Sequence, residues 1–385
     1  MTTDQSGAAA EPMIGGAPTD VSASAAGAAP TLWPPLPRPV LVARVVIGVV
    51  LAAAALYAPF YFEPTMNRVL SQAIYIAIAA MGLNLLTGFN GQVSIGHGAF
   101  YGVGAFTSAI LMIDYNWSFE PTIVVSALLT GVFGLLVGLP ALRVRGLYLA
   151  LVTLGLAVLF PRVAQKFVDG AGGVALLRPP SREFSSLIDG LDDDQWAYFL
   201  CLAIMVVLFV LAWNLVRGRV GRAMIAVRDQ EIAATTVGVN LAGTKVATFA
   251  ISAAYAGIAG SLSVMVDRLA DGTNPILYFQ RSIEFLVAMT IGGAATILGP
   301  AVGALALVML RRNTENLIEG KEILAPALYG AALIAIVFVL PEGLVGGVRR
   351  LLARLGRRSS AKGRPPTVPH PDDSHDIGGP HVERT

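Results

Sequence analysis

Charged residues are scarce in this sequence, and their scarcity excludes an ordinary soluble protein. Only 14% of the 385 residues are charged and 55% are hydrophobic, whereas roughly a quarter of the residues are charged in soluble domains. A water-soluble core cannot account for so much apolar sequence, so we expect long segments to face lipid or one another. The single cysteine, Cys201, excludes a disulfide, a CxxC redox pair and a thiolate metal site within the chain. We expect it to be a small packing residue.

The common motifs of nucleotide hydrolysis and covalent catalysis are also missing. The sequence contains no G-x-x-x-x-G-K-[ST] phosphate loop, no H-E-x-x-H and no G-x-S-x-G. We therefore expect this chain to be no enzyme and to hold no cofactor or metal. Any ATP that drives its function must be bound by partner subunits.

Long apolar segments fill the middle of the chain, from residue 39 to residue 348. A membrane-spanning helix needs about 20 residues, so this region can hold about eight to ten spans. The predicted fold is all-α, a polytopic transmembrane helical bundle. The expected crossings lie at about residues 40–62, 70–87, 95–113, 122–139, 147–166, 196–216, 246–266 and 324–340. Glycine and proline interrupt residues 285–310, which predicts two short helices or a re-entrant hairpin there.

The two ends of the chain differ in composition from this domain. Residues 1–38 are rich in Ala, Gly, Pro, Ser and Thr and show no apolar periodicity, which predicts a disordered arm. Residues 349–385 begin with a basic cluster and are predicted to form a disordered cytoplasmic tail. The positive-inside rule then predicts that both termini are cytoplasmic in a multi-pass protein of the inner membrane. The basic loop 217–245 fits this topology, whereas the basic segment 311–321 does not.

Pairs of glycines at four-residue spacing predict places where helices approach closely. Such pairs stand at 98 and 102, at 134 and 138, and at 299 and 303. Small residues at this spacing let helix backbones pack against each other in lipid.

The basic loop contains the segment GRAMIAVRDQEIAATTVG, residues 221–238. Its mixture of charged and apolar residues predicts one or two short amphipathic helices at the cytoplasmic surface. Small residues in it would let another protein dock closely, although a helix that rests on lipid headgroups is an alternative. The candidate docking residues are Arg222, Arg228, Glu231, Ala233, Ala234 and Gly238.

Two further segments place polar residues or helix breaks within the apolar region. Residues 82–106 carry Asn84, Gln92, Ser94 and His97, which must face protein, water or a passing solute. For the first three, hydrogen bonds between helices are the alternative to lining a pathway, and for His97 it is simple packing. Residues 281–304 carry Gly292 and Gly293, which break a helix and are candidates for a gate. Glu284 in this segment either lines a pathway or pairs with Arg281.

These three segments resemble one family of transport proteins. Glu231-Ile232-Ala233-Ala234, followed after three residues by Gly238, resembles the EAA motif of ABC-importer permeases. The surrounding GRAMIAVRDQEIAA is similar to the LivM family, the permeases of branched-chain amino acid importers. The strings GLNLLTGFNGQVSIGHGAFYGVGAF and RSIEFLVAMTIGGAATILGPAVGA resemble signatures of the same family and stand in the same order. Ile232 and the lack of an Ile-x-Leu-Pro ending depart from the general EAA motif.

The resemblance implies a cytoplasmic coupling helix and a set of partners. These are a homologous second permease, two cytoplasmic ATPase subunits, an extracytoplasmic solute-binding protein and the lipid bilayer, with no nucleic acid. The implied function is ATP-driven import of branched-chain amino acids or related small polar solutes such as urea and amides. The alternative from the residues alone is a stand-alone secondary transporter or channel, but the expected spans contain almost no carboxylates other than Glu284.

Overall fold

A computed structural model describes the chain over residues 38–144, 146–168, 176–177, 179, 191–274, 276–317, 324–339 and 343–347. Residues 1–37 and the predicted tail 349–385 lie outside this described part, so their predicted disorder stays a prediction. The chain divides into two compact units, Met1–Ala55 and Leu56–Thr385. The described part of the first unit is the beginning of one helix, α1, and the second unit holds the elements discussed below.

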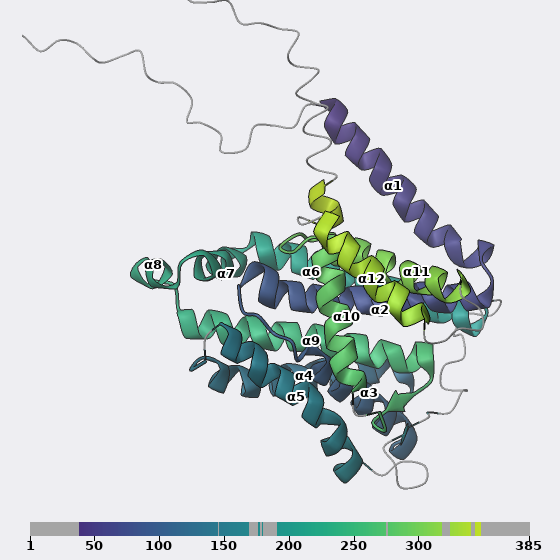
Figure 1. The fold of residues 1–385 in the computed structure, drawn as a ribbon, viewed down its shortest axis with the longest axis horizontal. Helices are drawn as coiled ribbons and strands as arrows, with labels where there is room; N and C mark the ends of the chain where they lie inside the picture. The colour runs from purple at the N-terminus through teal and green to yellow at the C-terminus, as the bar shows by residue number, and fades with distance from the viewer. Residues whose placement is uncertain are drawn as a thin grey trace, which may run out of the picture. The chain divides into compact units, whose positions relative to one another are not determined.

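The described elements are almost all helical, which confirms the predicted all-α fold (Figure 1). A two-residue antiparallel ladder, which pairs Leu176 with Asp271 and Leu177 with Ala270, is the exception. In chain order the elements are α1 (Arg38–Tyr61), α2 (Pro64–Leu83), the π-helix η1 (Asn84–Phe89), α3 (His97–Asp114), α4 (Phe119–Ala141), α5 (Leu147–Phe167), β1 (Leu176–Leu177), α6 (Asp193–Arg217), α7 (Arg219–Asp229), α8 (Glu231–Thr236), α9 (Leu241–Asp267), β2 (Ala270–Asp271), α10 (Leu277–Gly292), α11 (Gly299–Leu317) and α12 (Leu324–Val339).

Five helical segments among the described residues are long and apolar enough to cross a membrane, by length and composition. They are Pro64–Phe89, Phe119–Ala141, Leu147–Lys166, Asp193–Arg217 and Leu241–Asp267. Each corresponds to a predicted crossing. The larger predicted number of eight to ten crossings depends on shorter helices such as α3, α10 and α12, and it stays a prediction.

Helix α9 lies at the centre of the second unit, in contact with α2, α3 and α4. Small residues make this packing possible. A Cβ atom added at Gly104 of α3 would overlap the backbone of Gly257 in α9, so only glycine permits this helix crossing. Three buried hydroxyl groups join the same helices: Ser108 Oγ lies 2.9 Å from Ser126 Oγ of α4 and 2.6 Å from Ser261 Oγ of α9. Hydrogen bonds of this kind satisfy polar groups that lipid cannot satisfy.

The predicted glycine contacts are present in the fold. A Cβ at Gly98 would overlap the carbonyl of Tyr278 in α10, and one at Gly134 would overlap Ala253 in α9. Likewise, a Cβ at Gly303 would overlap the carbonyl of Ala288, where α11 packs on α10. These glycines therefore set the distance between neighbouring helices.

Candidate functional site

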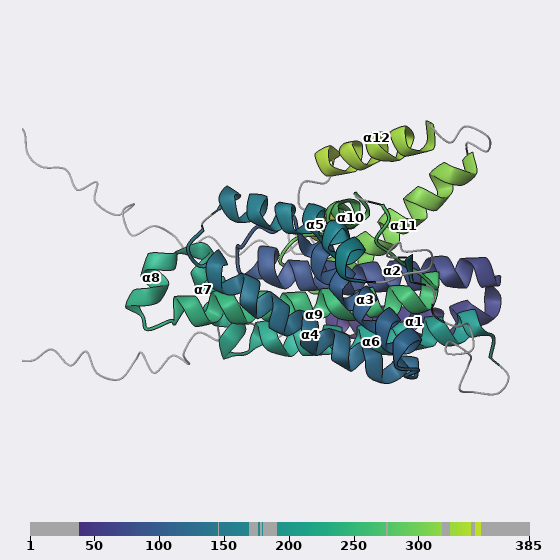
Figure 2. The ribbon, with the colours of Figure 1, turned by 90° about the horizontal axis from the view of Figure 1, so that it is seen from below.

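Helices α7 and α8 and the two residues that follow them form a short helical arm, which we define as residues 219–238. Figures 1 and 2 both show it at the end of the second unit where α6 ends and α9 begins. Gln230 has extended backbone angles and separates the two helices. The sequence predicts one or two short amphipathic helices in this segment, and the structure has two. Met224, Val227 and Ala234 are buried, while the polar residues alternate with them on the outer side.

Polar contacts anchor the arm to the helical bundle at two points. The Arg228 guanidinium donates a hydrogen bond of 3.0 Å from Nη1 to the carbonyl oxygen of Gly88 in η1, and it also pairs with Asp229. Gly91 has a φ of +75° and lies against the Arg228 side chain, where a Cβ atom would collide with it. At the second point, Glu231 at the start of α8 accepts a short hydrogen bond from Lys245 in α9. The arm is therefore held by both the α2–η1 segment and α9.

The outer surface of the arm is largely polar but also carries two exposed apolar side chains near its end. Ile232 and Val237 are 80% and 78% exposed, although exposed large apolar side chains gain nothing from water. Ala233 is also exposed, and Gly238 turns the chain with a φ of +85° in open space. Arg222 donates a hydrogen bond to the Arg217 carbonyl, which ties the start of α7 to the end of α6. This surface offers apolar side chains for contact and small residues that let another protein approach closely. It is therefore suited to docking of another protein.

Asn84 joins the two segments that the sequence marks as broken helices. Its Nδ2 donates a hydrogen bond of 2.7 Å to the carbonyl of Thr296, and its Oδ1 accepts one of 2.8 Å from the backbone N–H of Ala295. Both partners lie in residues 293–298, the non-helical stretch between α10 and α11. Gly88 leaves room for this clamp, because a Cβ there would overlap Asn84 Oδ1. Asn84 thus satisfies backbone groups that the helix break leaves free.

The other polar residues of the 82–106 segment are buried between helices. Gln92 donates to the carbonyl of Lys245 at 3.2 Å, which adds a further contact with the start of α9. Ser94 and His97 are 0% and 1% exposed, and neither has a hydrogen-bond partner for its side chain among the described residues. The His97 ring lies edge-on to Phe100 and Phe285, with centroids 6.1 and 6.3 Å away. Their predicted roles along a pathway stay predictions.

The 281–304 segment forms two helices separated by a break. Gly292 ends α10 where a Cβ would overlap the Gly299 carbonyl, and Gly293 has a φ of +115° that only glycine adopts readily. Glu284 pairs with Arg281 at 2.8 Å and with Arg311 of α11 at 3.6 Å. The ion-pair alternative for Glu284 is therefore present in the structure. A pathway role for Glu284, Gly292 or Gly293 stays a prediction.

Two charged residues with several contacts escaped the sequence analysis. Lys245 is the fifth residue of α9 and pairs with Glu231. Asp267 at the last residue of α9 accepts hydrogen bonds of 3.0 Å from both Gln72 and Tyr75 of α2. A charge at each end of an apolar helix was the available signal, but sequence alone does not show the partners. In the described part of the chain no cluster of three or more His, Cys, Asp or Glu residues could hold a metal ion.

Comparison with known proteins gives one consistent result. The profile of the family described as "Branched-chain amino acid transport system / permease component" matches residues 65–338. The high-affinity branched-chain amino acid transport system permease protein LivM of Escherichia coli is 28% identical over 75% of this chain and 71% of that protein. LivH of Escherichia coli is 23% identical over 74% and 96%, and the ribose import permease protein RbsC of Haemophilus influenzae is 24% identical over 77% and 91%. No solved structure matches the chain.

Proposed function

Because the chain belongs to the family of branched-chain amino acid transport permease components, we propose that it carries branched-chain amino acids or related small polar solutes across the inner membrane. It is a multi-pass membrane protein and a transport subunit, and the ATPase of such a system is a separate subunit. The proposal assigns to this chain the passage of the solute and the response to ATP hydrolysis. The observation that carries it is the helical arm, because it is anchored on one side and exposes apolar residues on the other.

The arm is suited to convey movement from a partner to the bundle. An ATPase subunit that grips Ile232 and Val237 would act directly on α8, and the ion pair between Glu231 and Lys245 links α8 to α9. Arg228 links α7 to η1 through the Gly88 carbonyl. A shift of the arm therefore favours one arrangement of α9 and η1 over another, which is the basis of alternating access.

The proposed assembly contains this permease, a homologous second permease, two cytoplasmic ATPase subunits and an extracytoplasmic solute-binding protein. In this topology the arm and both termini face the cytoplasm. The names of LivM and LivH relatives, which are permeases of one type of transport system, support the pairing of two permeases. A secondary transporter working alone would require no docking surface, whereas the exposed apolar residues of the arm support an external source of energy.

The experiment is leucine uptake by the complete complex in proteoliposomes, with and without ATP. Glu231→Arg places like charges beside each other, and we expect ATP-dependent uptake to fall at least about tenfold, which corresponds to about 1.4 kcal/mol. Exchange of both charges, Glu231→Arg with Lys245→Glu, rebuilds the ion pair and is expected to restore much of the uptake. Binding of the ATPase subunits is measured by co-purification for each variant.

Ile232→Asp tests the docking surface separately. Since Ile232 is 80% exposed, the change should leave the fold intact and weaken co-purification of the ATPase subunits. Ile232→Leu, which keeps an apolar side chain of similar size at the same position, is the matched control and should retain them. Uptake of leucine by the purified permease without ATP or ATPase subunits would contradict the proposal.

A further inference from the structure

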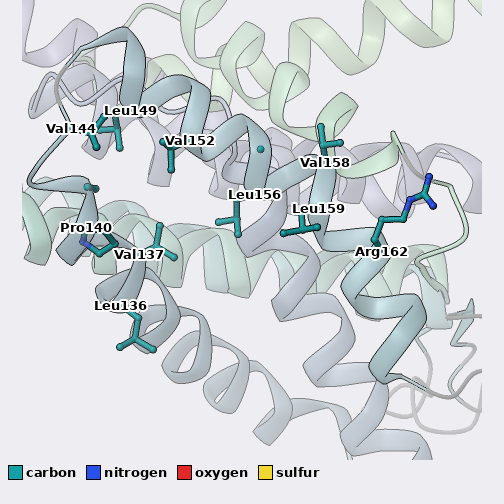
Figure 3. A pocket seen from close by; sticks show the side chains of 12 residues that line it. Leu136, Val137, Pro140, Val144, Leu149, Val152, Leu156, Val158, Leu159 and Arg162 are labelled. Carbon is teal, nitrogen blue, oxygen red and sulfur yellow. The ribbon is translucent and has the colours of Figure 1, made fainter.

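A groove between α4 and α5 has a volume of about 900 Å³. None of the polar pathway candidates from the sequence lines it. Figure 3 shows its side chains along both helices, with Val144 and Leu149 near one end and Arg162 at the other. Its size falls within the range of small-molecule sites, roughly 300–1,000 Å³.

Arg162 gives this otherwise apolar groove its chemical character. It lies within the candidate membrane span Leu147–Lys166. Its side chain has no hydrogen bond or ion pair in the part of the chain that the structure describes. Arg162 is exposed and lies four residues before the end of this span, where a long side chain can keep its charge at the polar interface. The guanidinium is therefore available to an anion that approaches along the groove, and it is suited to hold a carboxylate with two parallel hydrogen bonds.

Gly155 lines the groove on the α5 side. A Cβ added there would meet no atom within 4 Å, so no helix contact within this chain requires glycine. In the interior of a helix glycine costs about 1 kcal/mol relative to alanine. On a surface that only faces fluid lipid, glycine would offer no advantage that offsets this cost. In a space that admits a solute, the missing side chain leaves room for that solute.

We propose that this groove is part of the route of the carried solute and accepts an amino acid with an apolar side chain. The apolar lining from Val137, Val152, Leu156 and Leu159 receives the side chain, and the Arg162 guanidinium receives the carboxylate. Leu136, Val152 and Leu159 are more than half exposed, so the homologous permease covers the open side in the assembled transporter. The inference rests on the proposed function and assigns the solute to a place in this chain.

The first experiment asks whether water and small ions reach the groove in the assembled complex. Gly155→Cys is made with Cys201→Ala and treated in lipid nanodiscs with a charged, membrane-impermeant methanethiosulfonate. Gly330→Cys in α12 is the matched control, because a Cβ there also meets no atom within 4 Å. We expect the thiol at 155 to react and the thiol at 330 to remain unmodified. No reaction at 155 would overturn the proposal, since lipid or a partner helix would then fill the groove.

The second experiment measures ATP-dependent leucine uptake by the reconstituted complex carrying Arg162→Gln, Arg162→Lys or Gly155→Leu. Loss of a hydrogen bond to a charged group is expected to lower uptake by Arg162→Gln at least about tenfold. Arg162→Lys keeps the charge and should retain more uptake than Arg162→Gln. Gly155→Leu should reduce uptake to near background, while Gly330→Leu leaves it unchanged.

The controls separate the failure of this inference from that of the proposed function. If the unmodified complex takes up no leucine with ATP, the proposed function is overturned and the amino-acid assignment of the groove with it. If the unmodified complex transports leucine and Arg162→Gln transports it equally well, only the groove is overturned. If Gly155→Leu prevents co-purification of the second permease, its loss of uptake reflects failed assembly, and the result for Arg162→Gln then decides the proposal.

Discussion

Two sets of apolar helices in the second unit differ in how much of their surface is buried by the rest of the protein. The most apolar stretches of Pro64–Phe89 and Leu241–Asp267 are 83% and 78% buried, whereas those of α4, α5 and α6 are only 28%, 33% and 22% buried. All five would be identified as membrane spans from their hydropathy. What distinguishes α9 from α6 is its content of glycine, alanine and serine, which lets α2, α3 and α4 approach it. In a lipid environment, small residues therefore mark the inner helices better than large apolar ones do.

Glycine at the α3–α9 crossing gives the sharpest test of this difference. Gly104→Ala forces two backbones apart, and we expect it to lower the free energy of unfolding by at least about 3 kcal/mol. Gly131→Ala in α4 is the control, because its Cβ would make only ordinary contacts of 3.6 Å with Ala254. That change should be neutral or stabilising. Chemical denaturation in detergent micelles measures both, and equal stabilities would contradict the assigned role of small residues.

A pair of leucines compares loss of packing in the two sets of helices. Leu262 in α9 is 0% exposed and Leu128 in α4 is 66% exposed. Leu262→Ala leaves a cavity and is expected to cost about 2 to 3 kcal/mol. Leu128→Ala exchanges one lipid contact for another and should change the stability by less than about 0.5 kcal/mol. A similar loss for both would mean that α4 is covered by protein in the state that is measured.

Replacement of His97 is expected to have an effect of the opposite sign, smaller than the effects of Gly104→Ala and Leu262→Ala. Its two ring nitrogens are buried without partners among the described residues, and such a group is expensive to bury. His97→Leu removes that cost, so we expect an increase of about 1 kcal/mol in the free energy of unfolding. The midpoint of thermal unfolding measures the change. A stabilised protein that no longer transports leucine would support the predicted pathway role of His97, and a stabilised protein with normal uptake would support simple packing.

The order and type of the helices follow closely from the sequence. Hydropathy predicts α3, α4, α5 and α6 to within three residues at each end, because a span of fixed length leaves little freedom. In contrast, α9 begins five residues before its predicted crossing, and α10 and α11 extend eight and seven residues beyond the predicted segment 285–310. The predicted crossing 70–87 differs from the structure in two ways. The helix begins earlier, at Pro64, and it changes to π-helical geometry at Asn84. At that change Asn84 forms hydrogen bonds with residues 295 and 296, more than two hundred residues away, and these contacts cannot be read from local sequence.

The candidate site was predicted in part. Family resemblance indicated Arg228 and Glu231, but their partners, the Gly88 carbonyl and Lys245, depend on tertiary structure. The groove could not be predicted, because apolar residues that line a cavity look like any others that face lipid. Arg162 was the available signal within it, a cation inside an otherwise apolar span.

Helix α9 is mostly apolar, and a charged residue near each of its ends makes polar contacts with a neighbouring helix. Lys245 holds Glu231 near its start, and Asp267 at its last residue accepts hydrogen bonds from Gln72 and Tyr75. At about 1.5 Å per residue, these two points lie roughly 33 Å apart along a stiff rod. A rod cannot lengthen, so a pull on its first turn must be taken up by sliding or tilting at the far end. A displacement of the arm is therefore expected to alter the hydrogen bonds of Asp267 at the opposite end of the helix.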